Sequence, residues 1–205
     1  MTVSDGGQGR PPLERSREAL IEVATQTLLQ DPRASLGDLA QRIGIGRTTL
    51  HRHFPTRAAL VQSLAYDALN RLATAYRAVG LEPGHGGAAD VDVDVHAVVG
   101  HLVEVTLPLG PRLMFLLRTV ELNDDPEVLR RTAAMDLPLD AVLVAGQTSG
   151  SLDGQPPVWW LRESLYSLVY LAWEQIHLGR LAAHDAAPLV LQTWWGGAAS
   201  TSEVT

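Results

Sequence analysis

A group of basic and hydroxyl side chains between positions 47 and 57 has the chemistry to bind a nucleic acid. The group consists of Arg47, Thr48, Thr49, His51, Arg52, His53 and Arg57. A guanidinium can grip a phosphate with two parallel N–H donors, and hydroxyl groups can contact phosphates or base edges. Side chains this close in sequence reach one nucleic acid together if a short helix presents them on one side.

A helix, a tight turn and a second helix are predicted over residues 35–57. Ser35 with Asp38 three residues later forms the pattern of a capping box, which marks the start of a helix. Apolar residues then recur at helical spacing until Gly44, which can adopt the positive φ of a sharp turn. The first helix is therefore expected to end at Gly44.

The second helix is predicted to run from Arg47 to Pro55, because proline cannot continue a helix. Leu50 and Phe54 share its inner face, and the basic and hydroxyl side chains lie on the other side. A short helix that is apolar inside and basic outside is typical of a helix presented to the major groove of DNA.

The stretch from about Arg15 to Leu64 resembles the DNA-binding domain of TetR-type transcriptional regulators. The resemblance rests on the pattern L-x-x-L-A-x-x-x-G-I-x-x-x-x-L-x-x-x-F-x-x-[KR]-x-x-L. The sequence departs from the family pattern at Gly46, where Ser or Thr commonly caps the recognition helix, and at His51, where Tyr is usual. The resemblance implies that double-stranded DNA is contacted by Ser35, Gly46, Arg47, Thr48, Thr49, His51, Arg52, His53 and Arg57.

The charge distribution separates the two halves of the 205-residue chain. Residues 1–77 hold ten arginines against seven acidic residues and carry +3, whereas residues 78–205 hold six arginines against sixteen acidic residues and carry −10. A basic surface confined to one end suits a DNA-binding domain. The chain contains no cysteine, which excludes disulfides and thiolate metal sites and suits a reducing compartment.

An all-α fold of about nine helices is predicted, with an N-terminal three-helix DNA-binding domain and a C-terminal helical bundle. The expected divisions are a flexible arm over 1–12, the helix-turn-helix domain over 13–59, a regulatory ligand-binding and dimerisation domain over 60–196, and a flexible tail over 197–205. A helix beginning near Arg57 links the two halves. The stretch VDVDVH over 91–96 alternates like a strand. We expect the start of a helix there instead, because no partner strand is predicted and aspartates are favourable in the first turn of a helix.

The predicted helix from about Pro157 to Leu178 is apolar nearly all round, and such a helix is buried on more than one side. One side can pack within the subunit, and the other can meet a second copy of the chain. Together with the following helix it would form a four-helix dimer interface, as the family resemblance also implies. The proposed interface residues are Leu168, Leu189, Leu191, Trp194 and Trp195. A monomer with one thick core is the alternative.

A small-molecule pocket is expected among the helices of the C-terminal half, because a few polar groups among aromatic residues are typical of a ligand site. The candidate lining residues are His101, Glu104, Met114, Phe115, Arg118, Glu121, Trp159, Tyr166, Tyr170 and Trp173. Plain core packing is the alternative for each aromatic residue. The identity of the ligand does not follow from these residues.

The chain lacks the motifs of common enzyme classes, since it has no G-x-S-x-G, P-loop, G-x-G-x-x-G or H-E-x-x-H sequence. The spacing of His96, His101 and Glu104 does not place both histidines on one helix face, so no metal site, no cofactor and no catalytic residue is expected. The sequence shows neither a signal peptide nor an apolar run long enough to span a membrane, which predicts a cytoplasmic protein with no membrane partner.

These observations predict a DNA-binding transcriptional regulator, best described as a repressor that binds a palindromic operator as a homodimer and is released by a small molecule. Its expected partners are double-stranded DNA, a second copy of itself and an unidentified small-molecule effector. The alternative is a small-molecule-binding or protein-interaction module whose helix-turn-helix does not bind DNA, which histidine in place of tyrosine at His51 favours.

Overall fold

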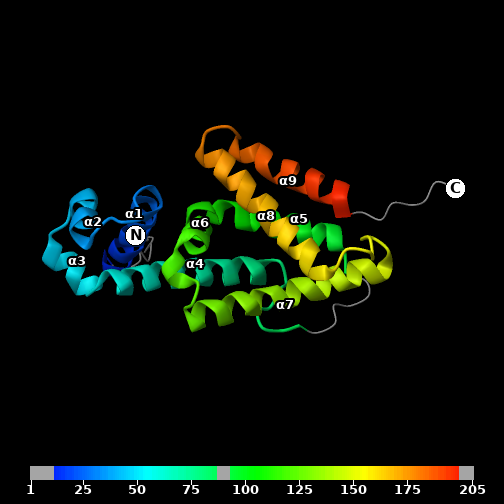
Figure 1. The fold of residues 1–205 in the computed structure, drawn as a ribbon, viewed down its shortest axis with the longest axis horizontal. Coiled ribbons are helices and arrows are strands. Elements are labelled where there is room, and N and C mark those ends of the chain that lie inside the picture. The colour runs from blue at the N-terminus through cyan, green and yellow to red at the C-terminus, as the bar shows by residue number, and fades with distance from the viewer. Residues whose placement is uncertain (1–11, 87–92, 199–205) are drawn as a thin grey trace, which may run out of the picture. The chain divides into compact units, whose positions relative to one another are not determined.

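The structure is a computed structural model that describes residues 12–86 and 93–198 (Figure 1). These residues form nine α-helices and two short 3-10 helices without a strand among them, so the all-α prediction is confirmed. The chain divides into two compact units, residues 1–64 and residues 65–205, and helix α4 (Arg57–Ala78) contributes residues to both. The predicted arm and tail lie almost entirely outside the described residues, although α1 already begins at Pro12 and α9 continues to Ala198.

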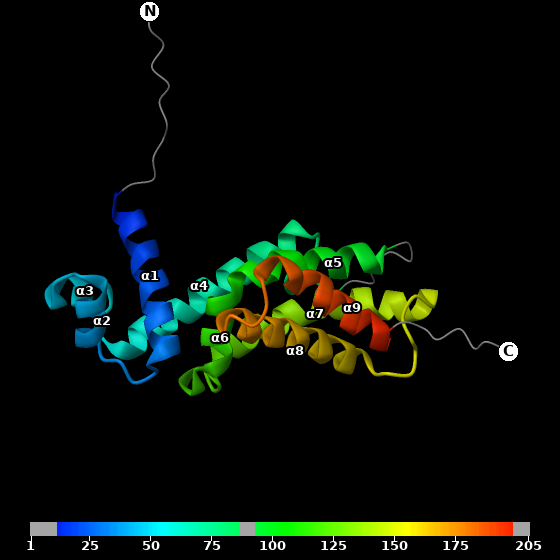
Figure 2. The same ribbon diagram turned by 90° about the horizontal axis from the view of Figure 1, so that it is seen from above.

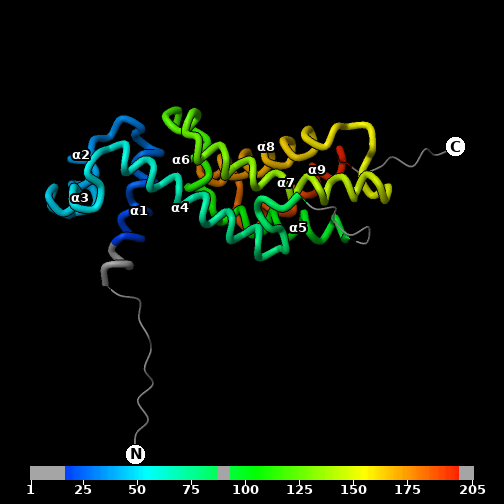
Figure 3. Tube along the Cα trace, turned by 90° about the horizontal axis from the view of Figure 1, so that it is seen from below, coloured from blue at the N-terminus to red at the C-terminus, as the bar shows by residue number. Residues whose placement is uncertain are grey.

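The first unit contains α1 (Pro12–Gln30), α2 (Leu36–Ile43), α3 (Arg47–His53) and the first part of α4, with α2 packed against both α1 and α3 (Figure 3). The capping box at the start of α2 is present: the backbone N–H of Asp38 donates to Ser35 Oγ at 3.2 Å, and the backbone N–H of Ser35 donates to the Asp38 carboxylate at 2.9 Å. Gly44 has φ 77° and ends α2, as its position in the sequence predicts.

The inner side of α3 is fixed by burial. Leu50 and Phe54 are each 1 % exposed, and Leu39 of α2 and Leu60 of α4 are fully buried in the same unit. Burying one large apolar side chain of this kind stabilises the folded state by roughly 1.5–3 kcal/mol. The rotation of α3 about its own axis is therefore set by its apolar side, and its polar side must face outward.

The second unit contains α5 (Val95–Thr106), α6 (Gly110–Arg118), α7 (Pro126–Ser149), α8 (Val158–His177) and α9 (Ala183–Ala198). Helix α8 packs against α7 and α9, and α9 also packs against α5 (Figure 2). Asp94 caps α5 by accepting the N–H of Ala97 at 3.0 Å, so residues 95 and 96 of the alternating stretch are helical as expected. Residues 91 and 92 of that stretch lie outside the described residues.

Between α5 and α7, the prolines at 108 and 111 predict a break followed by one helix over about 112–122, and the structure differs from this prediction. Helix α6 begins earlier, at Gly110, and ends at Arg118 because Thr119 is extended with ψ 100°. A separate 3-10 helix covers Val120–Leu122. Gly110 is required at its position, since a Cβ there would lie 2.4 Å from the indole ring of Trp173.

Candidate DNA-binding surface and ligand pocket

The outer face of α3 carries four exposed polar side chains: Arg47, Thr48, His51 and Arg52. Their spacing of one, four and five positions places them on one side of the helix, opposite the buried Leu50. Two guanidinium groups and a hydroxyl on one exposed helix face can contact the phosphates and base edges of a duplex.

The remaining predicted DNA contacts flank this face. Thr49 and His53 are half-buried at its edges, and Gly46 is the exposed N-cap residue of α3. Because glycine has no capping side chain, no side chain caps the first N–H groups of α3. Ser35 is exposed, but its hydroxyl is already engaged with Asp38. Thr49, His53 and Gly46 therefore border the outer face of α3, whereas Ser35 lies at the start of α2.

Three basic side chains have intramolecular neighbours that bear on their predicted roles. The Arg47 guanidinium lies against Gly37, where a Cβ would be 3.3 Å from Arg47 Nη2. Arg57 Nη2 donates to the carbonyl oxygen of Pro32 at 2.6 Å, which ties the start of α4 to the turn before α2. His51 Nδ1 lies 3.4 Å from the Pro55 carbonyl oxygen, and since a carbonyl oxygen can only accept, this nitrogen must carry the proton.

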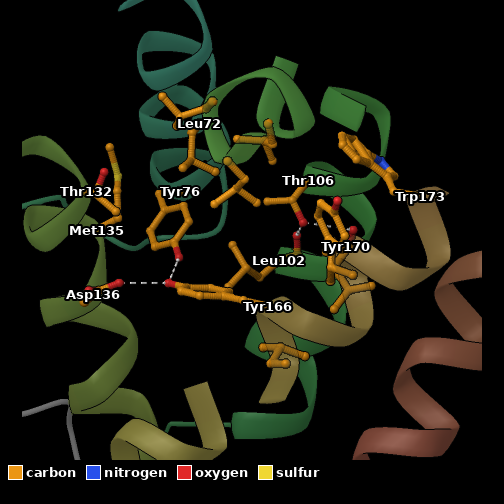
Figure 4. A pocket seen from close by; sticks show the side chains of 16 residues that line it. Leu72, Tyr76, Leu102, Thr106, Thr132, Met135, Asp136, Tyr166, Tyr170 and Trp173 are labelled. Carbon is orange, nitrogen blue, oxygen red and sulfur yellow. Dashed lines mark hydrogen bonds between the residues drawn. The ribbon is translucent and has the colours of Figure 1, made fainter. Parts of the chain in front are cut away.

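A cavity of about 140 Å³ lies inside the second unit (Figure 4). Its wall is built from α4, α5, α6, α7 and α8. The lining residues are Leu72, Tyr76, Leu102, Val103, Thr106, Leu113, Leu116, Leu117, Thr132, Met135, Asp136, Leu165, Tyr166, Val169, Tyr170 and Trp173. An apolar cavity of roughly 150 Å³ accommodates a molecule the size of benzene, so a larger ligand can enter only if lining side chains move.

One end of the cavity is polar. The hydroxyls of Tyr76 and Tyr166 are 2.7 Å apart, and Tyr166 donates to Asp136 Oδ1 at 3.3 Å (Figure 4). Since Tyr166 gives its proton to the carboxylate, the Tyr76 hydroxyl must be the donor in the tyrosine pair. Burial raises the pKa of both tyrosines, which keeps the two hydroxyls protonated.

The carboxylate of Asp136 belongs to a charged cluster behind this end. Arg162 lies 3.6 Å from Asp136, 2.6 Å from Asp140 and 3.2 Å from Glu163, so three carboxylates share one guanidinium. Burial raises the pKa of Asp136, and the positive charge of Arg162 opposes that rise. The cluster carries an excess of negative charge when its acidic groups are ionised.

Three of the ten residues predicted to line a pocket do so, namely Tyr166, Tyr170 and Trp173. Arg118 lies outside the cavity wall but contacts it, because its Nε donates to the Tyr170 hydroxyl at 2.7 Å. The structure does not bring the other six to the cavity: His101, Glu104, Glu121 and Trp159 are exposed, while Met114 and Phe115 are buried elsewhere.

These six corrections follow from helix rotation. Leu102, Val103 and Thr106 face the cavity from α5, which turns His101 and Glu104 toward solvent. On α6 the cavity side is formed in the same way by positions 113, 116 and 117, so positions 114 and 115 point away from it. Trp159 lies two helical turns before Tyr166, roughly 10 Å along α8, and is beyond the cavity.

Asp136 was absent from the sequence-based prediction. The signal in the sequence is that Met135, one position before it, and Leu139, three positions after it, are apolar. This spacing places the carboxylate at the edge of the apolar face of a helix, and both neighbours are buried in the structure. The helical spacing of Leu72 and Tyr76 predicts that both lie on the apolar stripe of the helix that begins near Arg57, and the structure also places them in the cavity wall.

Comparison with known proteins assigns the family. No family model matches the chain. The chain is 32 % identical over 179 residues to the HTH-type transcriptional repressor LfrR of Mycolicibacterium smegmatis, a match that covers 85 % of this chain and 82 % of LfrR. A crystal structure of the TetR-like regulator LfrR in complex with proflavine superposes with a TM-score of 0.67 at 25 % identity, covering 91 % of this chain and 98 % of that one. The chain belongs to the TetR family of transcriptional regulators.

Two further proteins are similar to this regulator. The HTH-type regulator NfxB of Pseudomonas aeruginosa is 28 % identical over 183 residues, covering 89 % of this chain and 94 % of NfxB. The ketosteroid regulator KstR2 of Mycobacterium tuberculosis shares the fold, with a TM-score of 0.69 at 18 % identity over 95 % of this chain and 98 % of that one. The chain is a ligand-responsive DNA-binding regulator and not an enzyme, as its family assignment establishes.

The predicted dimer residues of this TetR family member fall in two environments. Leu189 is 50 % exposed on α9. Trp194 is 3 % exposed, and its Nε1 donates to the Leu161 carbonyl oxygen and to Ser164 Oγ, both at 3.1 Å, so it belongs to the core of the subunit. Leu168, Leu191 and Trp195 are half-buried against that same core. Trp195 also stacks on His96, with ring centroids 3.6 Å apart.

Exposed apolar side chains also lie along one side of α8. Trp160, Leu171 and Leu178 are 57 %, 49 % and 52 % exposed and share one side of the helix. Helix α9 packs beside α8 and carries another exposed leucine, Leu189, and these four exposed apolar residues are called the α8–α9 face below. Within the described residues, no helix is long and apolar enough to cross a membrane, and no three potential metal ligands are gathered.

Proposed function

We propose that this regulator is a homodimeric repressor that binds a palindromic operator through α3 and is released from it by an apolar, positively charged effector. The observation that carries the DNA-binding role is the exposed basic face of α3, held outward by the burial of Leu50 and Phe54. In a twofold dimer, two such helices read two half-sites of a palindrome.

DNA binding is tested with the duplex upstream of the regulator's own gene. Replacing Arg52 with Ala should weaken binding to all sequences and reduce the slope of log affinity against log salt by about one, because one phosphate contact is lost. Arg77→Ala is the matched control, since Arg77 is exposed in the second unit and pairs with Glu82 at 3.5 Å. Equal salt slopes for both variants would remove α3 from the proposal.

The apolar α8–α9 face supports dimerisation. Leu171→Glu and Leu189→Glu place a charge where the second copy would bury it, which costs several kcal/mol. Both variants should sediment as monomers at micromolar concentration, where the parent should be a dimer. Val144→Glu on α7 is the matched control, because Val144 is 49 % exposed but lies outside this face. A monomeric parent protein would contradict the homodimer.

The donors and acceptors of the cavity support a cationic effector. Tyr76 and Tyr166 use their protons within the Asp136 network, and Thr106 and Thr132 donate to backbone carbonyls of their own helices. These hydroxyl groups therefore offer a ligand only their lone pairs, next to the negatively charged cluster around Arg162. An effector with N–H donors and a positive charge matches that end, and an aromatic body matches the rest.

The relative LfrR supports the same class, because its structure is described as a complex with proflavine, which is a flat aromatic cation. Proflavine is accordingly the first effector to test. It should change tryptophan emission, and Asp136→Asn should weaken its binding while Asp185→Asn, at an exposed site on α9, should not. By thermodynamic linkage, operator DNA should weaken proflavine binding by the same factor by which proflavine weakens DNA binding. Equal proflavine affinity with and without DNA would contradict release by this effector.

A further inference from the structure

A cluster of three polar side chains joins α6 to α8 at the outer edge of the cavity. Arg118 donates from Nε to the Tyr170 hydroxyl at 2.7 Å and from Nη2 to Glu174 Oε1 at 2.6 Å. Its guanidinium carbon is also 5.6 Å from the centre of the Tyr170 ring. The cluster fixes Tyr170 with its hydroxyl turned to Arg118, so that the apolar ring is left to line the cavity.

This cluster lies where the cavity meets solvent. Leu117 lines the cavity and is 65 % exposed, and Arg118 follows it at the end of α6. The Arg118 and Glu174 side chains are 40 % and 36 % exposed. A ligand that enters beside Leu117 and Tyr170 therefore passes close to this ion pair, and any net charge there acts on it.

The net charge at the mouth of the cavity, where Leu117 and Tyr170 meet solvent, depends on Glu174. Of the residues that line the cavity, Asp136 is the one with an acidic or basic side chain, and the Arg118–Glu174 pair adds one charge of each sign at the mouth. Without Glu174, the guanidinium would remain as an uncompensated positive charge next to an apolar cavity. An apolar cavity with one arginine at its entrance is suited to amphipathic anions, whose apolar part can be buried while the anionic group pairs with the arginine.

We propose that Glu174 determines the charge specificity of the effector site: by neutralising Arg118 at the mouth, it prevents amphipathic anions from being held there and leaves the acidic inner end to select cations. The proposal rests on the effector site proposed above. It makes Glu174 a specificity-determining residue that need not itself line the cavity.

The test uses two fluorescent probes that differ by one anionic group. N-phenyl-1-naphthylamine is neutral, and 1-anilinonaphthalene-8-sulfonate is the same aromatic body with a sulfonate. The measured quantity is the ratio of their dissociation constants for each variant of the full-length protein, titrated by probe emission. Because both probes need the same cavity, a change in folding or in cavity size alters both constants, whereas a change in charge specificity alters their ratio.

The parent protein should bind the neutral probe more tightly than the sulfonate. Glu174→Gln should improve sulfonate binding about tenfold relative to the neutral probe, as expected for one unpaired charge near the ligand in a partly solvated site. Arg118→Gln should give no such gain, because it removes the cation that would bind the sulfonate. Glu82→Gln is the matched control: it breaks the exposed pair with Arg77 and changes net charge equally, but neither residue lines the cavity.

The outcomes separate the two proposals. An unchanged ratio in Glu174→Gln, with the neutral probe still bound, overturns the role of Glu174 and leaves the effector site standing. An equal gain in Glu82→Gln also overturns it, because the effect would then belong to the net charge of the protein. Failure of the parent protein to bind the neutral probe overturns the effector site itself, and the role of Glu174 with it.

Discussion

The two units of this regulator differ in how far apart in the sequence their functional residues lie. The residues proposed to contact DNA all lie between Ser35 and Arg57, whereas the cavity wall draws on five helices between Leu72 and Trp173. In the first unit, caps and a glycine turn act over three or four residues. In the second, a side chain reaches the cavity or misses it by the rotation of its helix. Local signals therefore determine the outer face of α3, and long-range packing determines the cavity.

The strongest test of this difference is Trp194→Ala in the second unit. The change removes a buried indole and two hydrogen bonds, so the free energy of unfolding should fall by about 3–5 kcal/mol, as measured by urea denaturation followed by circular dichroism. Gln192→Ala, at an exposed neighbouring position, should change it by less than about 0.5 kcal/mol. A variant with parental stability but no dimer would return Trp194 to the interface predicted from the sequence.

Gly110→Ala tests whether one contact between distant segments holds the cavity in shape. A methyl group 2.4 Å from the Trp173 ring forces the indole or α6 to shift, which should cost about 1–3 kcal/mol of stability and weaken proflavine binding. Gly100→Ala in α5 is the control, because the nearest atom to its Cβ is 4.0 Å away and alanine favours a helix. Equal effects at the two glycines would show that the Trp173 contact does not shape the site.

Ser35→Ala tests whether a capping interaction between residues close in sequence stabilises the first unit. Loss of the capping hydroxyl of α2 should destabilise the first unit by about 1 kcal/mol and lower DNA affinity. All five tryptophans lie at position 159 or later, so tryptophan emission should report an unchanged second unit. Ser63→Ala, whose hydroxyl donates to the Ala59 carbonyl within α4, should leave both signals near the parental values. A shift of the tryptophan transition would show that the two units do not unfold independently.

The smallest effect is expected in the pH dependence of stability, where one aspartate of each unit should act with opposite sign. Hydrogen bonds with Ser35 lower the pKa of Asp38 in the folded state, so its contribution is present above the ordinary value of 3.8 and is lost as pH falls through the lowered pKa. Burial raises the pKa of Asp136, so its contribution is greatest below 3.8 and declines as pH rises through the raised pKa.

Urea denaturation between about pH 3 and pH 7 measures both effects. Asp136→Asn should become more stable relative to the parent as the pH rises, because it lacks the carboxylate whose ionisation burial disfavours. Asp38→Asn should become less stable relative to the parent as the pH rises from the acid end, because it lacks the carboxylate that Ser35 stabilises. Asp185→Asn, an exposed residue whose side chain lies beside His184, serves as the reference for a surface carboxylate. Parallel curves for the Asp38 and Asp136 variants would show that the two carboxylates lie in equivalent environments.

Helix positions could be predicted from the sequence because their signals are short-range. The capping pair at Ser35 and the turn at Gly44 both appear in the structure where the sequence places them. The long apolar helix α8 was also expected, and its bounds differ by one residue at each end. The bounds were least accurate between α5 and α7, where two prolines permit both a break and a helix start.

The lining of the cavity was predictable only in part, since residue type does not reveal which way a helix is turned. Trp159 and Trp173 have the same side chain on the same helix, yet one is 54 % exposed and the other lines the cavity. The same ambiguity affected Trp194, whose apolar ring suits an interface or a core equally well. Its burial depends on the packing of α9 against α5 and α8, where its indole reaches Leu161 and Ser164, 33 and 30 positions earlier in the chain.

The sequence by itself determined the fold class, the family and the polar face of α3, because periodicity, capping and turn residues act within a few positions of the chain. Tertiary structure decided that Asp136 meets Tyr166, that Glu174 neutralises Arg118, and that Trp173 lies on Gly110. Each of these contacts joins residues at least 30 positions apart, and packing of several helices fixes which side of each helix faces inward.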